Sequence, residues 1–365
     1  MMYRMASDLP IGTLLDSSTP ASLNPARLNR HTFWCGQSGS GKTYSLGVLL
    51  EQVLLHTRLP IVVLDPNSDF VRLGEIRDDA PQEQAAELAQ RTIRVLHSAA
   101  GQGQQLKVKF LDLDVRSRAA LLQLDPVLDK REYNTLLRAE SSGLTELEGQ
   151  ALIAGLRDSG DPDLHDISLR IDNLGVTEWD MWAYGDEPVT SVVDAQADAT
   201  VVDLGSFDVK EQMQTAALAV LEHLWNNRHD RVGRLVVLDE AHNLCSPEPS
   251  SPLEELLTDR IVQIAAEGRK YGIWLLLSTQ RPSKVHPNAL SQCDNLALMR
   301  MSSAHDLAEL GLAFGYAPAD LLERAMGFKQ GQALFAGGFA PEPQLIQVGK
   351  RLTEEGGSDV AVPLR

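Results

Sequence analysis

The sequence has 365 residues, enough for one large α/β domain or two smaller ones, and its 43% hydrophobic content excludes wholesale disorder. It begins without the apolar core of a signal peptide, and no apolar run approaches the ~18 residues of a membrane span. The net charge of −17 argues against a uniformly basic, nucleic-acid-binding surface. We therefore expect a cytoplasmic protein with no membrane segment.

The charges are unevenly distributed along the chain. Residues 111–200 contain 19 Asp and Glu but only 7 Lys and Arg. Between residues 269 and 300, one acidic residue (Asp294) accompanies five basic ones, namely Arg269, Lys270, Arg281, Lys284 and Arg300. This composition is compatible with a local positive patch and equally with an ordinary solvated surface.

The chain begins with residues 1–30, whose prolines predict an extended lead-in. Strand and helix signals then alternate, the pattern of a parallel sheet covered by helices, which makes the expected fold class α/β. The expected strands are residues 32–35, 60–64, 92–96, 108–113, 200–204, 235–238, 274–277 and 295–301. The main expected helices are residues 42–55, 210–225 and 253–270.

The stretch from residue 115 to residue 194 differs from the rest of the chain. It is acidic and mainly helical, with expected breaks at 141–143 and 159–162, so we predict an insertion within a core formed by residues 31–114 and 195–350. The insertion is either a site of partner contacts or a solvated helical insert. Two helices and two strands should complete the core before a polar, mobile tail at residues 351–365.

The three cysteines, Cys35, Cys245 and Cys293, are widely separated and lack CxxC spacing. They predict reduced, mostly buried thiols of a cytoplasmic protein, not a zinc site or a disulfide framework.

The stretch GQSGSGKT, residues 36–43, fits the phosphate-binding P-loop pattern and lies between a predicted strand and an amphipathic helix. Its glycines let backbone N–H groups turn inward around phosphates, while Lys42 reaches the β and γ oxygens and the Thr43 hydroxyl binds Mg²⁺. We therefore predict a site for ATP and Mg²⁺ formed by Gly36, Gln37, Ser38, Gly39, Ser40, Gly41, Lys42, Thr43 and Tyr44.

A second motif, RLVVLDEAHNL, spans residues 234–244. Its apolar strand brings Asp239 to the carboxyl edge of the sheet, where the side chain can hold the water shell of Mg²⁺. Glu240 follows and can polarise a water molecule for attack on the γ-phosphate. A kinase needs no such glutamate, so the motif predicts hydrolysis of ATP by water.

The stretch WLLLSTQRPS, residues 274–283, is an apolar strand that ends in polar residues. Because parallel strands present their carboxyl ends at one edge, Gln280 should lie near Lys42 and Asp239. A neutral amide there can bond the γ-phosphate or the attacking water, so we predict that Gln280 senses the nucleotide.

Together these motifs resemble those of the HerA/FtsK superfamily of ring-forming ATPases, and the HerA branch in particular. The resemblance rests on GQSGSGKT, VVLDEAHN and above all EGRKYGIWLLLSTQRPSKVHPNALSQCDN (residues 267–295), and it covers roughly residues 27–115 and 195–350. It implies a RecA-like core of the ASCE P-loop NTPase type and a homo-hexamer that translocates on or unwinds double-stranded DNA. A nuclease partner such as NurA, or another effector, is often associated with such a motor.

The resemblance also implies an arginine finger supplied by the neighbouring subunit. Arg300, at the end of the strand expected at 295–301, is the first candidate and Arg281 the second. The alternative for Arg300 is an internal salt bridge.

The resemblance has limits. Longer HerA proteins carry an N-terminal β-barrel that helps assembly and partner docking, but only 35 residues precede Gly36 here, which puts both in doubt. The membrane segments and winged-helix module typical of FtsK are also missing, which disfavours a divisome-anchored pump. Two other functions stay open, a nucleotide-dependent scaffold for an effector and a soluble ATPase that pumps protein.

Overall fold

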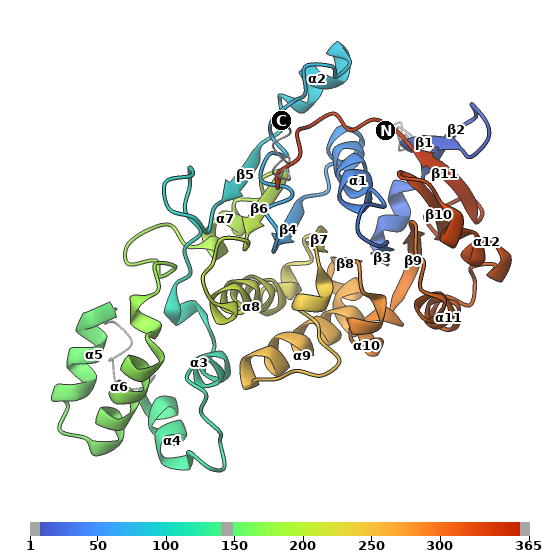
Figure 1. The fold of residues 1–365 in the computed structure, drawn as a ribbon. Coiled ribbons are helices and arrows are strands. Elements are labelled where there is room, and N and C mark those ends of the chain that lie inside the picture. The colour runs from blue at the N-terminus through green and yellow to red at the C-terminus, as the bar shows by residue number, and fades with distance from the viewer. Residues whose placement is uncertain (1–7, 140–148, 358–365) are drawn as a thin grey trace, which may run out of the picture.

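The computed structural model of the protein describes residues 8–139 and 149–357, whose strands form one eleven-stranded sheet (Figure 1). The strand order is β2-β1-β11-β10-β9-β3-β8-β7-β4-β6-β5. Neighbours from β9 to β5 in this order pair in parallel, and the pairs from β2 to β9 are antiparallel. The mostly parallel sheet confirms the predicted α/β class.

The parallel strands are β9 (Cys293–Leu298), β3 (His31–Cys35), β8 (Ile273–Thr279), β7 (Arg234–Leu238), β4 (Ile61–Asp65), β6 (Ala199–Asp203) and β5 (Ile93–Leu96). Each confirms a predicted strand, with ends shifted by up to three residues. The antiparallel strands are β1 (Leu9–Leu14), β2 (Pro20–Leu23), β10 (Gln332–Gly337) and β11 (Gln344–Val348).

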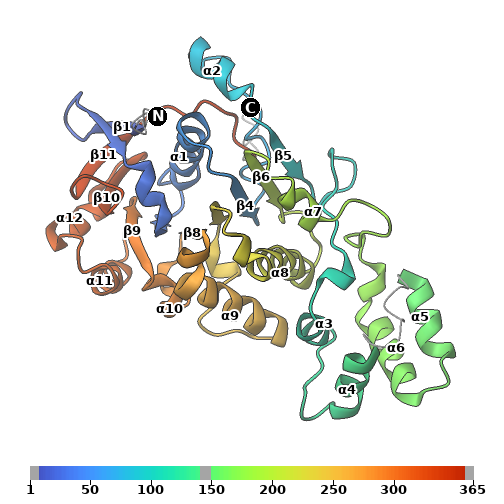
Figure 2. The same ribbon diagram turned by 180° about the vertical axis from the view of Figure 1, so that it is seen from behind.

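The sheet is buried on both faces by helices. On one face lies α1 (Lys42–His56), with α2 (Gln82–Leu88) beside it; on the other lie α8 (Lys210–Asn226), α9 (Pro252–Glu267) and α10 (Pro287–Leu290) (Figures 1 and 2). Alternate residues of β7 serve the two sides, because side chains alternate along a strand. Leu235 and Val237 pack into the cluster that contains α1, whereas Val236 and Leu238 pack into the one that contains α8 and α9.

The lead-in expected at residues 1–30 contributes two strands to the sheet. Strand β1 pairs antiparallel with both β2 and β11, and its Leu9 and Ile11 are fully buried. Gly12 allows the close approach to β11, since a Cβ there would lie 2.1 Å from the carbonyl oxygen of Gln347. Residues 1–7 lie outside the described parts of the chain.

The strand predicted at residues 108–113 is wrong. Val108 forms only an isolated parallel bridge with Trp182, and residues Phe110–Asp112 form a 3₁₀ turn. The backbone of Val108 bonds to Met181 and Ala183 of the returning insertion, so this apolar segment pairs outside the main sheet. The segment is apolar because it is buried, and this gives its sequence a strand-like pattern. An apolar run alone does not show whether the segment pairs within a sheet.

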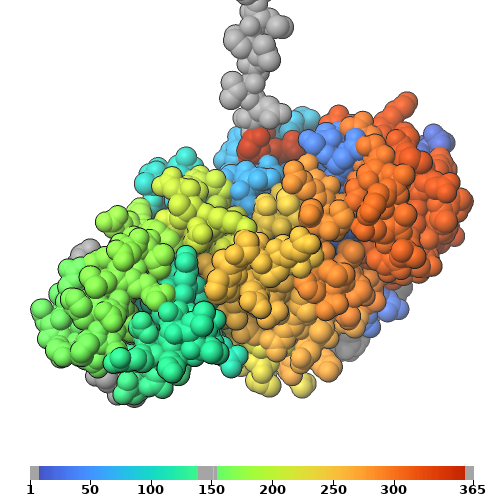
Figure 3. Space-filling model, turned by 60° about the horizontal axis from the view of Figure 1, so that its bottom comes forward, coloured from blue at the N-terminus to red at the C-terminus, as the bar shows by residue number. Residues whose placement is uncertain are grey.

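The predicted insertion leaves the sheet after β5 and returns at β6. It contains α3 (Val115–Leu121), α4 (Lys130–Ala139), α5 (Gly149–Asp158), α6 (Pro162–Leu174) and α7 (Val189–Asp194). Helices α3 to α6 form a lobe beside α8 and α9 (Figure 3). The break expected at 159–162 separates α5 from α6, whereas the one expected at 141–143 lies outside the described residues.

The chain after β9 folds as predicted into two helices, α11 (Ala304–Ala313) and α12 (Ala319–Glu323), followed by β10 and β11. The beginning of the expected mobile tail is instead fixed. Arg351 and Leu352 are 2% and 4% exposed, and Thr353 bridges to Ile76. Residues 358–365 of that tail lie outside the described part of the chain.

Two further expectations concern the helices and the cysteines. The helix predicted at 253–270 ends at Glu267 and continues as a 3₁₀ turn to Tyr271, where Gly272 reverses the chain with a φ of 84°. The three cysteines are buried free thiols, as predicted. In the described ranges, none of the helices combines the length and apolar character that a membrane crossing requires.

Candidate nucleotide-binding site

The loop of residues 36–41 connects β3 to α1 at the carboxyl edge of the sheet. Gly39 and Gly41 adopt φ values of 71° and 88°, the left-handed region that glycine tolerates without strain. Ser40 is buried, and its hydroxyl has no hydrogen-bond partner among the described residues. Such a group needs an acceptor or donor from outside, and a phosphate oxygen would satisfy it.

The loop is held from the β9 side as well. The Gln37 amide donates to the Arg300 carbonyl oxygen at 2.9 Å, and the Gln37 side-chain oxygen accepts from the amide and hydroxyl of Ser302 at 2.9 and 2.6 Å. Gln37 therefore shapes the loop through its side chain, while Ser38 is exposed.

Lys42 begins α1 and points into a buried cluster. Its Nζ lies 2.8 Å from Oδ1 of Asp239, 3.2 Å from Oε1 of Glu240 and 2.9 Å from the Ser278 hydroxyl. Burial acts to lower the pKa of Lys42, but the carboxylates of Asp239 and Glu240 outweigh it and raise the pKa above its usual value. The ammonium is thus charged and currently paired with protein carboxylates.

Asp239 and Glu240 follow directly on β7. Glu240 has φ 42° and ψ 50°, a left-handed conformation that is strained for a residue with a side chain. Asp239 Oδ1 also accepts from the Ser278 hydroxyl at 2.6 Å. In contrast, Oδ2 of Asp239 is buried with no hydrogen bond to any described residue, whereas Oε2 of Glu240 lies 3.2 Å from Nδ1 of His242. A metal-bound water would satisfy the Asp239 oxygen.

Gln280 lies just beyond β8, and its Nε2 donates to Oε1 of Glu240 at 2.8 Å. On the other side, Nδ1 of His242 is 3.2 Å from Oε2 of Glu240 and 3.0 Å from the Thr279 hydroxyl. Burial acts to raise the pKa of Glu240, but His242, Lys42 and Gln280 together lower it to about 2. Glu240 is therefore ionised at neutral pH, as a base must be.

Two aspartates at the end of β4 join the cluster and were not predicted. The Asp65 carboxylate accepts from the backbone amides of Asp69 and Phe70 at 3.0 and 2.7 Å and so fixes the loop after β4. Asp69 accepts from the Thr43 hydroxyl at 3.2 Å. Burial and the charge of Asp239 raise the pKa of Asp65 to about 8 and that of Asp69 to about 6. The sequence signal was available, since DPNSD follows an apolar strand.

These residues fit a divalent cation. Carboxylate and hydroxyl oxygens are the ligands that Mg²⁺ prefers, and the orphaned Oδ2 of Asp239 and the Thr43 hydroxyl lie in the same acidic cluster. Burial is the main cause of the raised pKa values of Asp65 and Asp69, and the charge of Asp239 is the second, a repulsion that a bound cation would relieve.

Arg300 and Tyr44 both make contacts within their own chain. Strand β9 ends at Leu298, and Arg300 Nη2 donates to the Gly39 carbonyl oxygen of its own chain at 3.3 Å. The Arg300 Nε is buried without a hydrogen bond among the described residues. The Tyr44 hydroxyl accepts from the Arg351 amide at 2.7 Å, which ties it to the C-terminal segment.

The basic residues between 269 and 300 do not form one patch. Arg269 precedes β8, whereas Arg281 and Lys284 follow it and are exposed. Strand β8 separates the two groups by roughly 20 Å at ~3.3 Å per residue. Arg269 also pairs with Asp294 at 2.5 Å, and of these five basic residues Arg281 and Lys284 are the exposed ones at the nucleotide edge.

Comparison with known proteins points to one group. The family profile described as "Helicase HerA, central domain" matches residues 9–167. The DNA double-strand break repair helicase HerA of Pyrococcus furiosus is 24% identical over 92% of this chain and 69% of its own length. The protein of the same name from Sulfolobus acidocaldarius is 23% identical over 97% of this chain and 72% of its own length. The HerA of Sulfurisphaera tokodaii is 31% identical, but the matched stretch is 34% of this chain and 24% of that relative.

The fold has relatives among solved structures. VirB4 of Thermoanaerobacter pseudethanolicus superimposes with a TM-score of 0.65 at 15% identity, covering 94% of this chain and 96% of that one. The bacterial conjugative coupling protein TrwB superimposes with a TM-score of 0.60 at 13% identity, covering 97% of this chain and 92% of that one. These likenesses confirm the predicted RecA-like, mostly parallel fold.

Proposed function

Because the chain belongs to the HerA/FtsK superfamily of P-loop ATPases, we propose that it is an ATP-hydrolysing motor that translocates on or unwinds double-stranded DNA. One observation carries the proposal. Four side chains from three separate motifs meet at one edge of the sheet: Lys42 contacts Asp239 and Glu240, and Gln280 donates to Glu240. That is the arrangement hydrolysis of a nucleotide phosphate by water requires.

In this function the loop of residues 36–41 holds the phosphates of ATP through its backbone amides and the Ser40 hydroxyl. Lys42 exchanges its carboxylate partners for the β and γ oxygens. Thr43 and Asp239 would hold Mg²⁺, which when bound neutralises phosphate charge. Asp69 accepts from Thr43 and so lies beside the same position.

Glu240 acts as the general base through Oε2, which faces Nδ1 of His242 at 3.2 Å and is not held by Lys42 or Gln280. Gln280 and Lys42 hold the other oxygen, Oε1, which fixes the orientation of the carboxylate. When ATP draws Lys42 away, Gln280 remains the contact that links the base to β8. This supports the sensor role proposed for Gln280.

A motor of this type works as a homo-hexameric ring, and a cation must complete each site during hydrolysis. We propose Arg300 for this role. Its contact with Gly39 places the guanidinium at its own P-loop, which supports action in cis, whereas action in trans requires the side chain to turn toward a neighbour. Arg281, exposed at the same edge, is the second candidate in trans.

DNA would contact the exposed basic residues that follow β8, Arg281 and Lys284. The acidic lobe of α3 to α6 stands away from the sheet edge and is suited to bind a partner, such as a nuclease of the NurA type or another effector (Figure 2). We place this machine in the cytoplasm.

The decisive experiment measures the ATPase rate with and without duplex DNA, together with the native mass of the protein. A DNA motor should hydrolyse ATP faster on duplex DNA and should form a ring. A rate that duplex DNA leaves unchanged would contradict the motor and favour a nucleotide-dependent scaffold or a protein pump.

A further inference from the structure

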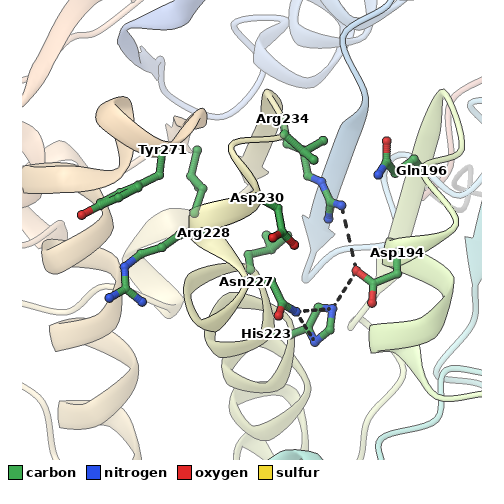
Figure 4. A pocket seen from close by; sticks show the side chains of 11 residues that line it. Asp194, Gln196, His223, Asn227, Arg228, Asp230, Arg234 and Tyr271 are labelled. Carbon is green, nitrogen blue, oxygen red and sulfur yellow. Dashed lines mark hydrogen bonds and ion pairs between the residues drawn. The ribbon is translucent and has the colours of Figure 1, made fainter.

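A second charged site lies at the opposite edge of the sheet from Lys42. Where β7 and β8 begin, a cavity of about 290 Å³ opens beside the end of α8 (Figure 4). Its walls combine the apolar Leu224 and Ile273 with charged and amide side chains from α7, α8 and the turn before β7. None of these groups takes part in the nucleotide chemistry described above.

Arg234, the first residue of β7, forms the base of this cavity. It is only 7% exposed, yet among the described residues its guanidinium makes no hydrogen bond and a single ion pair, with Asp194 Oδ1 at 4.0 Å. Burial lowers the pKa of Arg234 despite the nearby charges of Asp194 and Asp230. A guanidinium carries five N–H donors. Those of Arg234 that face the cavity are available to an acceptor bound there.

The rim of the cavity carries carboxylates. Asp194 already has a partner within the protein, because its Oδ1 also bonds to Nε2 of His223 at 2.8 Å. Asp230 and Gln196 lie on either side of Arg234 in Figure 4, and both are exposed with no side-chain hydrogen bond to a described residue. The free carboxylate of Asp230 can accept from an ammonium or another N–H donor.

The balance of charge limits the ligand further. The carboxylates of Asp194 and Asp230 disfavour a simple anion, and the guanidinium of Arg234 at the base disfavours a simple cation. A molecule with zero net charge that carries a positive and a negative group close together satisfies Arg234 and both carboxylates. Arg234 would engage a carboxylate in its bidentate fork, the geometry for which a guanidinium is suited.

We propose that this cavity binds a small zwitterion of the α-amino-acid type, with its carboxylate on Arg234 and its ammonium on Asp230. The ligand's side chain would lie toward Leu224 and Ile273, and Gln196 would contribute an amide contact at the rim. The site is separate from the proposed ATPase function, and its test does not involve nucleotide.

Isothermal titration calorimetry on the nucleotide-free full chain provides the test. Each of the twenty standard α-amino acids is titrated at roughly millimolar concentration, and any that binds is compared with its N-acetyl and carboxamide forms and with inorganic phosphate. We expect at least one amino acid to bind. Each blocked form should bind roughly tenfold more weakly or worse, because it loses one charge-assisted hydrogen bond.

Variants locate the binding. Arg234→Gln removes the cation at the base, and Asp230→Asn removes the anion at the exposed rim without disturbing the core; both should weaken binding at least roughly tenfold. Arg231→Gln is the matched control, since Arg231 is exposed and does not line the cavity, and it should bind as the wild type does.

Several results would overturn the proposal. The first is that no amino acid binds, as expected of a cavity that holds only water. The second is that phosphate or an N-acetyl form binds as tightly as the free amino acid. The third is that Asp230→Asn leaves the affinity unchanged. Should Arg234→Gln fail to fold, Asp230→Asn and the blocked ligands still decide the question.

Discussion

Helix α1 carries two buried ion pairs, one at its first residue and one in its middle, and they differ in how their oxygens are satisfied. At the first, Lys42 meets Asp239 and Glu240, and Oδ2 of Asp239 stays buried without a hydrogen bond among the described residues. In the middle, Glu51 accepts from the amides of Leu352 and Thr353 and from the Thr353 hydroxyl, and faces Arg351.

The difference is one of function. The carboxylates beside Lys42 must exchange partners when a ligand binds, whereas Glu51 and Arg351 must keep theirs. The unpaired Asp239 oxygen beside Lys42 costs stability and is available to a ligand. Glu51 and Arg351 are both fully buried, and a Cβ on Gly47 would lie 2.6 Å from the Arg351 guanidinium, so that pair has no room for a ligand. We therefore propose that the first pair serves chemistry, whereas the second fastens the C-terminal segment to α1.

The largest effect should come from Lys42→Ala. We expect it to abolish hydrolysis and weaken ATP binding, because backbone amides alone cannot neutralise the phosphate charge. ATP affinity by fluorescent-analogue titration and phosphate release give the two readouts. Hydrolysis that persists in this variant would place the chemistry elsewhere.

Arg300→Ala should follow, with a loss of roughly 10³ to 10⁵ in rate if Arg300 supplies the missing cation. Mixing this variant with Lys42→Ala subunits distinguishes action in trans from action in cis. Partial recovery indicates a finger supplied by the neighbour, whereas no recovery indicates the cis contact with Gly39. A full rate in Arg300→Ala alone would move the role to Arg281.

For the pair of Glu51 and Arg351 we expect a substitution to change the stability of the fold and not the rate of hydrolysis. Arg351→Met leaves Glu51 buried without its cation, which should lower the free energy of unfolding by about 3–5 kcal/mol. The matched control is Arg72→Met, because Arg72 is 44% exposed and solvent screens its pairs with Glu75 and Glu354, so this variant should lose little stability. Denaturant titration measures both. Equal losses in the two variants would remove the distinction between the pairs.

The smallest expected effect is that of Lys284→Ala on DNA binding. An exposed lysine that contacts a phosphate contributes about one unit to the slope of log affinity against log salt. Lys270→Ala, at the opposite edge of the sheet, is the control and should leave the slope unchanged. A slope that responds to Lys270 instead would put the DNA path on the other side.

Much of this edge of the sheet could be predicted from sequence, because each functional residue follows an apolar strand whose end is easy to locate. Asp65 follows such a strand too, but its local sequence does not show that β4 lies beside β7 and so brings it to the same cluster. The same limit hid the role of Arg351, which pairs with a glutamate 300 residues earlier in a segment that looks like a polar tail. Strand 108–113 was overpredicted because burial, not sheet pairing, produces its apolar pattern.

The most direct test of the proposed chemistry is Glu240→Gln, with bound and hydrolysed ATP measured in one preparation. The amide keeps the shape of the side chain but cannot take a proton from water. We predict that ATP binds and is retained while turnover falls by roughly 10² or more. Hydrolysis at the wild-type rate would contradict the role of Glu240 as the base and, with it, the reading of this sheet edge as the active site.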